Sequence, residues 1–359
     1  KGFFEVVTPT IEFYDVYNDK NIYIPQEHMY KLIDQKGRLL VLRPDSTAPI
    51  ARIVATRLKN SPLPIRLFYN QDVYKVSPKL SGRDDILNQI GAELIGTASI
   101  KSDFEMILNA FECIKNVSEN KKFRIEIGHI GIFKFIISKL NATEQLKEEI
   151  RKNIECKNYA ALNDILSKLE QTKYTNALKQ LPQLFGNEEV FQKAKQIFDD
   201  IEIIKILNYL EKIYLFQKKA GYEKSIMIDL GIVNEVDYYT GIIFKGYLEG
   251  SGDVILSGGR YDNLTEKYGI KMPAIGFAIN LNFIINTMNF IDLKQKTPDF
   301  LVYADDEFSL NAMDFIKNNS SSICEFSCDD SLENAKNTAR KKGIKKLVLV
   351  TEKIEYLNI

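Results

Sequence analysis

The stretch VNEVDYYTGIIFKGY, residues 233–247, combines side chains that could hold a small polar ligand. Asp237 supplies a carboxylate, and Tyr238 and Tyr239 supply phenol groups that donate and accept hydrogen bonds. The residue ahead of them is Asn234, where an arginine or lysine would grip a carboxylate or phosphate. The cluster therefore has the means to bind a ligand without an obvious means to activate it.

Two further pairs of polar residues have a spacing that suits a binding site. In RPDSTAPIAR, Asp45 and Thr47 stand two residues apart, ahead of an apolar run. The simplest interpretation is a helix N-cap with Thr47 in the first turn, whereas a ligand contact requires both side chains to face a cavity. In QIGAE, Gln89 and Glu93 share one face of a strand-like run. There they line a polar cavity or stand at a solvent-exposed edge.

The usual signatures of nucleotide, metal and covalent catalytic sites are missing. The glycine pair in SGGRYDNL predicts a tight bend rather than a phosphate-binding loop, and neither GxxxxGK[ST] nor GxGxxG occurs. Four scattered cysteines and two histidines match no zinc spacing. No Ser/His/Asp or Cys/His arrangement can be assembled from this order of residues. We expect no catalytic residue, no metal and no cofactor.

Composition limits the class of protein. The 359 residues include 48 basic and 48 acidic side chains, so the net charge gives no support to nucleic-acid binding. Hydrophobic residues make up 45% of the chain, enough for a sizeable core. No apolar run approaches the roughly 18 residues of a membrane span. Free cysteines suit a reducing cytoplasm, and the strand-like start at Lys1 leads us to expect preceding residues.

The elements that must position these residues can be predicted from periodicity. Residues 64–78 and 86–96 are rich in aliphatic and aromatic residues and predict an antiparallel pair of strands. Residues 103–117 have helical spacing and follow a Ser102–Asp103 start signal. From SIMIDLGIV onward the residues again have the composition of strands. The fold class we expect is therefore α+β, with an antiparallel sheet flanked by helices.

The pattern of apolar and charged residues along the chain predicts two domains. Residues from about 139 to 220 carry apolar residues at three- and four-residue spacing between Glu and Lys, which indicates a helical insert with solvated charged faces. Residues 298–359 alternate strand, helix, strand, helix and strand, which is typical of a small α/β domain. We therefore expect a core over 1–293 that contains the insert, followed by this C-terminal domain.

Seven fragments, in order, resemble the catalytic core of class II histidyl-tRNA synthetases. They are GFFEVVTPTIE, LRPDSTAPIAR, RLFYNQDVYK, NQIGAELIG, VDYYTGIIFKGY, LSGGRYDNL and AIGFAINL. The resemblance covers residues 1–137 and 222–292, and it implies a class II synthetase-like fold with a histidine pocket. Six residues of this chain match that pocket by position: Asp45, Thr47, Gln89, Glu93, Tyr238 and Tyr239. The first three would meet the α-amino group, and Glu93 and Tyr239 the imidazole, with Tyr238 beside them.

Three arginines that the resemblance implies for ATP and amino-acid activation are replaced. They correspond to Lys75, Asn234 and Phe283. Lysine keeps a charge but loses the planar fork that grips a phosphate. Loss of one such electrostatic contact typically slows a reaction ~10²–10³-fold, so adenylation should be negligible.

A kept pocket without activating residues resembles the regulatory subunits of ATP phosphoribosyltransferase, which are synthetase paralogues. FRIEIGHIGIF, the helical insert and the short tail are also similar to that family. The resemblance implies a non-catalytic subunit for the first step of histidine biosynthesis. It also implies a hetero-oligomer with the short-form catalytic subunit, self-association, and L-histidine as a feedback effector. The alternatives are a diverged ligase that activates histidine with ATP, and an RNA-binding module whose basic ARKKGIKK adjoins acidic EFSCDDSLE.

Overall fold

The computed structural model describes residues 1–359 except 20–21, 78–83, 119–120, 234–237 and 289–296. The described residues form two compact units, one ending at Met288 and the other holding residues 297–359. Each unit has its own sheet and its own apolar core. No helix in the described part of the chain is both long enough and apolar enough to cross a membrane.

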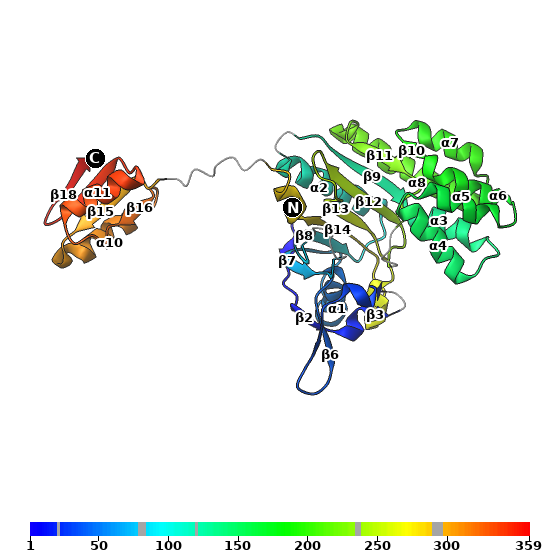
Figure 1. The fold of residues 1–359 in the computed structure, drawn as a ribbon, viewed down its shortest axis with the longest axis horizontal. Coiled ribbons are helices and arrows are strands. Elements are labelled where there is room, and N and C mark those ends of the chain that lie inside the picture. Colours follow the sequence, from blue (N-terminus) through cyan, green and yellow to red (C-terminus); the bar gives the residue numbers. More distant parts are fainter. Residues whose placement is uncertain (20–21, 78–83, 119–120, 234–237, 289–296) are drawn as a thin grey trace. The chain divides into compact units, whose positions relative to one another are not determined.

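The first unit is built on a nine-stranded sheet (Figure 1). In spatial order its strands are β1 (Phe4–Glu5), β7 (Ile65–Tyr74), β8 (Ile86–Ile95), β14 (Ala274–Asn280), β13 (Leu256–Arg260), β12 (Ile242–Leu248), β9 (Phe123–His129), β11 (Ile226–Asp229) and β10 (Phe185–Gly186). The predicted β7–β8 antiparallel pair is confirmed. The β1–β7 and β9–β11 pairs are parallel, so the sheet is mixed rather than purely antiparallel. The long segments between these strands permit this, because parallel strands need a crossover connection.

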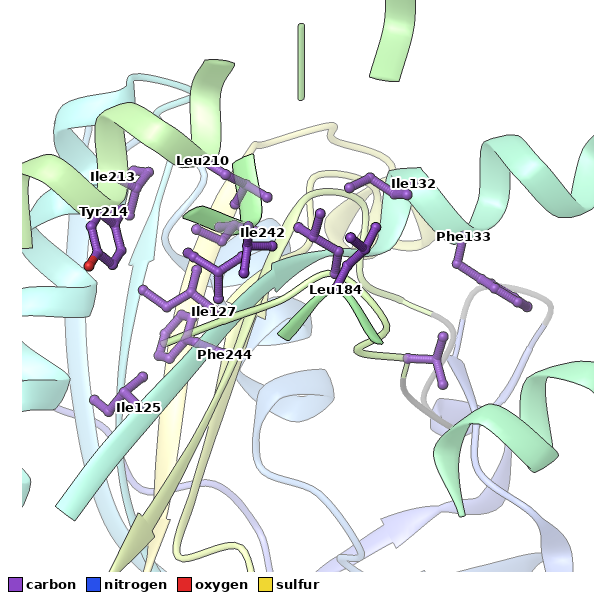
Figure 2. Close-up of a cluster of buried hydrophobic side chains, with 14 of the residues drawn as sticks. Ile125, Ile127, Ile132, Phe133, Leu184, Leu210, Ile213, Tyr214, Ile242 and Phe244 are labelled. Atoms are coloured by element: carbon purple, nitrogen blue, oxygen red, sulfur yellow. The ribbon is translucent and has the colours of Figure 1, made fainter. Parts of the chain in front are cut away.

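The two faces of this sheet differ in chemistry. Alternate residues of a strand point to opposite faces, and the registers bring Glu126, Lys245 and Ser257 together on one of them, the polar face. The opposite face belongs to a large apolar cluster. Figure 2 shows part of that cluster, to which β9, β12 and the helix α8 contribute: Ile125, Ile127, Ile242, Phe244, Leu210 and Ile213. Full burial of one such side chain contributes about 1.5–3 kcal/mol, so the apolar face holds the sheet and helices together.

Helices cover the apolar face of the sheet and one of its ends. They are α2 (Ile100–Val117), α3 (Ile130–Ser138), α4 (Glu144–Glu155), α5 (Tyr159–Ser167), α6 (Lys173–Gln180), α7 (Glu189–Ile197) and α8 (Ile201–Gln217). In Figure 1 the green helices α3 to α8 gather beside β9, β11 and β10. Their ends follow capping chemistry: the Thr143 side chain accepts the Leu146 N–H, and Thr172 and Thr175 form a capping box.

The start of α2 differs from the prediction. The helix begins at Ile100 rather than near Asp103, because the Ser99 side chain accepts the Lys101 N–H and caps it. Asp103 is instead buried within the helix, where it pairs with Arg260.

The glycine pair of SGGRYDNL is not a bend. Gly258 and Gly259 lie inside β13. A Cβ on Gly258 would stand 2.4 Å from the Phe244 ring, and one on Gly259 2.7 Å from the Tyr239 ring. The glycines therefore make room for two aromatic rings, which a sequence pattern alone does not distinguish from a turn.

The remaining strands and α-helices of the first unit lie outside the nine-stranded sheet and the helices that cover it. They are β2 (Ile11–Phe13), β3 (Asn18–Asp19), β4 (Ile22–Tyr23), β5 (Lys31–Ile33), β6 (Leu39–Leu42), α1 (Thr47–Arg57) and α9 (Leu281–Ile285). Strands β2, β6 and β5 form a separate three-stranded sheet. Of these elements, α1 matters most for function, because it begins at one of the predicted ligand residues.

The C-terminal unit has the predicted α/β pattern. Its elements are β15 (Phe300–Ala304), α10 (Ser309–Asn318), β16 (Cys324–Phe326), α11 (Leu332–Lys342), β17 (Lys346–Val350) and β18 (Ile354–Asn358). The sheet order is β16-β15-β17-β18, with the first three strands parallel and β18 antiparallel. One apolar cluster joins α11 to β15 and β17, and another joins α10 to the same strands. The two helices therefore cover opposite faces of this sheet.

Candidate functional site

A cavity of about 210 Å³ lies on the polar face of the nine-stranded sheet, over β8, β14 and β13. Drug-sized ligands usually occupy roughly 300–1,000 Å³, so this volume suits a molecule the size of an amino acid. All six residues predicted from the sequence line it: Asp45, Thr47, Gln89, Glu93, Tyr238 and Tyr239. We refer to it as the Glu93 cavity, after its most buried carboxyl group.

Glu93 is held by two hydroxyl groups. Its side chain is on the polar face of β8 and only 1% exposed. The Thr47 hydroxyl, at the start of α1, donates to Glu93 Oε1 over 2.9 Å, and the Tyr261 hydroxyl donates to Oε2. Burial raises the pKa of Glu93 to about 8, and the two hydroxyls offset only part of this shift. A cationic group of a ligand would lower this pKa and stabilise the charged carboxylate.

Asp45 both accepts a backbone hydrogen bond from α1, whose N-cap residue is Ser46, and lines the cavity. Its Oδ1 accepts the Ala48 N–H over 3.0 Å, which satisfies a backbone donor in the first turn of α1. The same carboxyl lines the Glu93 cavity. Burial raises its pKa, while the Ala48 N–H and the Lys75 ammonium oppose that rise. With Asp45 and Glu93 both lining one small cavity, a ligand that carries positive charge is favoured.

Three uncharged tyrosine side chains, Tyr238, Tyr239 and Tyr261, line the Glu93 cavity. Tyr238 and Tyr239 are each 8% exposed, and their ring centroids lie 4.8 Å apart. The Tyr261 ring stands 5.8 Å from that of Tyr238. Burial raises the pKa of all three phenols, so they keep their protons and act as neutral donors and acceptors.

The mouth of the cavity carries amide groups and a cation. Gln89 Nε2 donates to Asn280 Oδ1 over 2.9 Å, which fixes the amide across β8 and β14. Lys75, just after β7, is exposed and also lines the cavity. A zwitterion would thus meet carboxyl groups at the floor and an ammonium at the rim.

Several lining residues were not predicted from the sequence as ligand contacts. Tyr261 lies one residue beyond the glycine strand, inside a fragment interpreted as a turn. Glu155, at the end of α4, reaches the cavity from the helical insert, and nothing in the charge pattern of the insert distinguishes it. Asn234 and Asp237 lie outside the described residues.

The C-terminal unit presents a different surface. A hollow at the carboxyl ends of β15 and β16, where open α/β sheets usually bind ligands, is lined by acidic residues. They are Asp305, Asp306, Glu307, Asp329 and Asp330. Such a surface repels nucleic-acid phosphates, which disfavours the RNA-binding alternative. Within the described ranges, no group of three His, Cys, Asp or Glu side chains is arranged to hold a metal ion.

Comparison with known proteins gives consistent similarities. A family model described as histidyl-tRNA synthetase matches residues 1–284. The chain is 39% identical to an ATP phosphoribosyltransferase regulatory subunit of Clostridium novyi (strain NT), covering 100% of this chain and 86% of that protein. It is 41% identical to the protein of the same description from Clostridium botulinum (strain Langeland), covering 96% and 83%.

Solved structures share the fold. A crystal structure described as an ATP phosphoribosyltransferase regulatory subunit/histidyl-tRNA synthetase from Bacillus halodurans C gives a TM-score of 0.83 at 26% identity, covering 97% of this chain and 89% of that chain. A histidyl-tRNA synthetase from Nostoc sp. PCC 7120 gives 0.77 at 20% identity, covering 99% and 89%, a likeness of fold alone.

Proposed function

The chain belongs to the family of ATP phosphoribosyltransferase regulatory subunits, which share the histidyl-tRNA synthetase fold, and we propose that it is a non-catalytic regulatory subunit for the first step of L-histidine biosynthesis. Its partner in this proposal is the short-form catalytic subunit, which condenses ATP with phosphoribosyl pyrophosphate. L-Histidine is the proposed effector. The four free cysteines suit a cytoplasmic location for the complex.

The observation that carries this proposal is the chemistry of the Glu93 cavity. An α-ammonium group would pair with Asp45 beside the Gln89 amide, and an imidazole N–H would meet Glu93 and Tyr239. The Thr47 hydroxyl donates its proton to Glu93, so its oxygen lone pairs can accept a hydrogen bond from the α-ammonium. Lys75 at the rim suits the carboxylate of histidine.

The same geometry argues against a ligase that activates histidine. Phe283 packs against the apolar cluster of the first unit, whereas an arginine at that position would be needed for ATP. Lys75 offers a single ammonium in place of a planar fork. With these groups the transition state for adenylation would lack most of its electrostatic stabilisation. We therefore place the chain among binding proteins rather than enzymes.

Regulation without catalysis requires histidine to bind two states of the complex unequally. The coupling free energy between two such binding sites is typically about 1–3 kcal/mol. By thermodynamic linkage, substrates then change the affinity for histidine by the same factor as histidine changes the affinity for substrates. The proposed complex also contains more than one copy of this chain. Exposed apolar side chains on and beside β1 and β5 support such self-association, since Phe4, Val7 and Ile33 are each 75% exposed.

The decisive experiment combines this chain with a purified short-form catalytic subunit. We expect phosphoribosyltransferase activity to appear only when the chain is present, and L-histidine to lower it. Glu93→Gln keeps the shape of the side chain but removes its charge, so inhibition should need at least about tenfold more histidine. Histidine-dependent exchange of pyrophosphate into ATP, measured on the same preparations, should stay at background.

Three results would overturn the proposal. They are a pair of proteins that does not associate, histidine inhibition that Glu93→Gln leaves unchanged, and pyrophosphate exchange that this substitution abolishes. The last result would restore the ligase alternative.

A further inference from the structure

A second cavity, also of about 210 Å³, opens on the polar face near the other end of the sheet. It lies between β9, β11 and β10 on one side and the turn between α4 and α5 on the other. The proposed function makes no use of it. We refer to it as the Asp229 cavity, after the carboxyl group at its floor.

The floor is a buried acid. Asp229 ends β11 and is 9% exposed, and its Oδ1 accepts the Gly231 N–H over 2.9 Å. Burial and the neighbouring Glu126 carboxylate raise the pKa of Asp229 to about 6, while Lys157 opposes the rise. At neutral pH the floor therefore carries a negative charge that burial disfavours, and a ligand ammonium would stabilise it.

The rim carries two cations that flank one aromatic ring. The Arg124 guanidinium carbon lies 6.0 Å from the centroid of the Phe185 ring, and Lys157 Nζ lies 5.9 Å from it. Arg124 Nε pairs with Glu126 Oε1 over 2.9 Å. The guanidinium also lies over the Tyr247 ring, with its carbon 5.0 Å from the centroid, but in the described part of the chain its two terminal nitrogens have no hydrogen-bond or ion-pair partner. They remain able to bind a carboxylate in the forked geometry that arginine favours.

Lys157 occupies a position that usually belongs to glycine. It follows α4 with φ 53°, in the left-handed region. The Lys157 N–H donates to Ile154 O, and the Asn158 N–H donates to Asn153 O, which is the pattern of a Schellman helix end. Glycine would adopt this conformation without strain, so the local backbone does not explain a lysine there. Its side chain, however, supplies the second cation of the rim.

We propose that the Asp229 cavity binds the zwitterion of an α-amino acid with an apolar or aromatic side chain. The α-ammonium would pair with Asp229 and the carboxylate with Arg124 and Lys157, while the side chain packs against Phe185 and Pro182. A simple anion would approach the carboxylates of Asp229 and Glu126, and a simple cation would pass the two rim cations. A zwitterion of this size satisfies both ends.

This site would communicate with the first one through α4. Ile154 and Lys157, at and just beyond the end of that helix, line the Asp229 cavity, while Glu155 between them lines the Glu93 cavity. A ligand that orders this turn changes both walls at once. Occupancy of either cavity then alters affinity at the other, by the same factor in both directions.

Calorimetric titration of the full chain with individual L-amino acids tests the proposal. We expect one of them to bind at least about tenfold more weakly to both Asp229→Asn and Lys157→Gly, because each variant removes one charge-assisted contact. Gly252→Ala, in which the added Cβ meets no atom within 4 Å, is the matched control and should leave this binding within about threefold. Glycine fits the backbone at position 157, so that variant separates loss of binding from loss of folding.

Two analogues identify the class of ligand. The amino-acid amide lacks the carboxylate and the N-acetyl derivative lacks the ammonium, so each should bind at least about tenfold more weakly than the parent. Absence of binding by every amino acid would overturn the proposal, as would binding that responds to Glu93→Gln but not to Asp229→Asn. Equal binding of acetate or inorganic phosphate would show a simple anion site instead and would overturn it too.

Discussion

The Glu93 cavity and the Asp229 cavity share one face of one sheet and have the same volume, yet they treat a buried carboxyl group differently. In the first, the neighbours are the neutral hydroxyls of Thr47 and Tyr261, and the pKa reaches about 8. In the second, lysines lie nearby and the pKa reaches only about 6. Burial is the largest cause of both pKa rises, and Glu93 is the more deeply buried of the two groups. Lys75 lies at the rim of the Glu93 cavity, whereas Arg124 and Lys157 both line the Asp229 cavity.

The largest expected effect comes from filling the Glu93 cavity. In Gly276→Ala the new Cβ would stand 1.6 Å from Glu93 Oε2 and 2.9 Å from Ala92 O, so Glu93 must move. We expect histidine affinity in calorimetry to fall more than about 100-fold, with overpacking that costs about 1–3 kcal/mol of stability. In Gly252→Ala no atom lies within 4 Å of the added Cβ, and binding should be unchanged. Normal histidine binding by Gly276→Ala would place the ligand elsewhere.

The next effect concerns pH and the Glu93 carboxyl. Its pKa in the folded chain, about 8, exceeds the ordinary value of 4.5, so the folded chain binds the proton more tightly than the unfolded chain. The resulting stability is complete below about pH 4.5 and is lost as the pH rises through 8. Glu93→Gln stays neutral, so it should be more stable than the wild type at pH 8.5 by on the order of 2–4 kcal/mol. Urea denaturation at pH 5 and 8.5 measures this difference, and equal pH dependence in both proteins would contradict it.

The same substitution in the other cavity should have a smaller effect. The pKa of Asp229 rises from 3.8 to about 6, so its stabilising proton is lost over that lower window. Asp229→Asn should raise the unfolding free energy at pH 7.5 by roughly 1–3 kcal/mol, and little at pH 4. An effect larger than that of Glu93→Gln would reverse the ranking of the two cavities.

The smallest effect tests the strained rim. Lys157→Gly relieves a left-handed backbone and should raise the unfolding free energy by about 0.5–1 kcal/mol. The matched control is Lys168→Gly, since Lys168 ends α5 with φ −83° in the right-handed region. There glycine should cost about 0.5–1 kcal/mol. Urea denaturation of both variants checks the signs, and loss of stability in Lys157→Gly would mean that the lysine side chain holds the turn.

Part of the fold follows from local pattern. The β7–β8 pair and the α/β alternation after residue 298 reflect periodicities of two and about 3.6 residues, which neighbouring residues alone create. The placement of Gln89 and Glu93 on one strand face is of the same kind. The parallel pairing of β9 with β11 was missed, because the pattern within a strand says nothing about the direction of a partner roughly 100 residues away.

The candidate site divides in the same way. Residue types and spacing, together with the family resemblance, were enough to predict Asp45, Glu93 and the two tyrosines of DYY as site residues. Each of them lies in a short fragment whose residue types indicate its chemistry. Only the tertiary structure brought Glu155 from the helical insert into the Glu93 cavity and placed Asp229 opposite Lys157. These contacts join segments that carry no mutual signal along the chain. Burial within the folded core, rather than residue type, then sets the pKa values that distinguish one carboxyl group from the other.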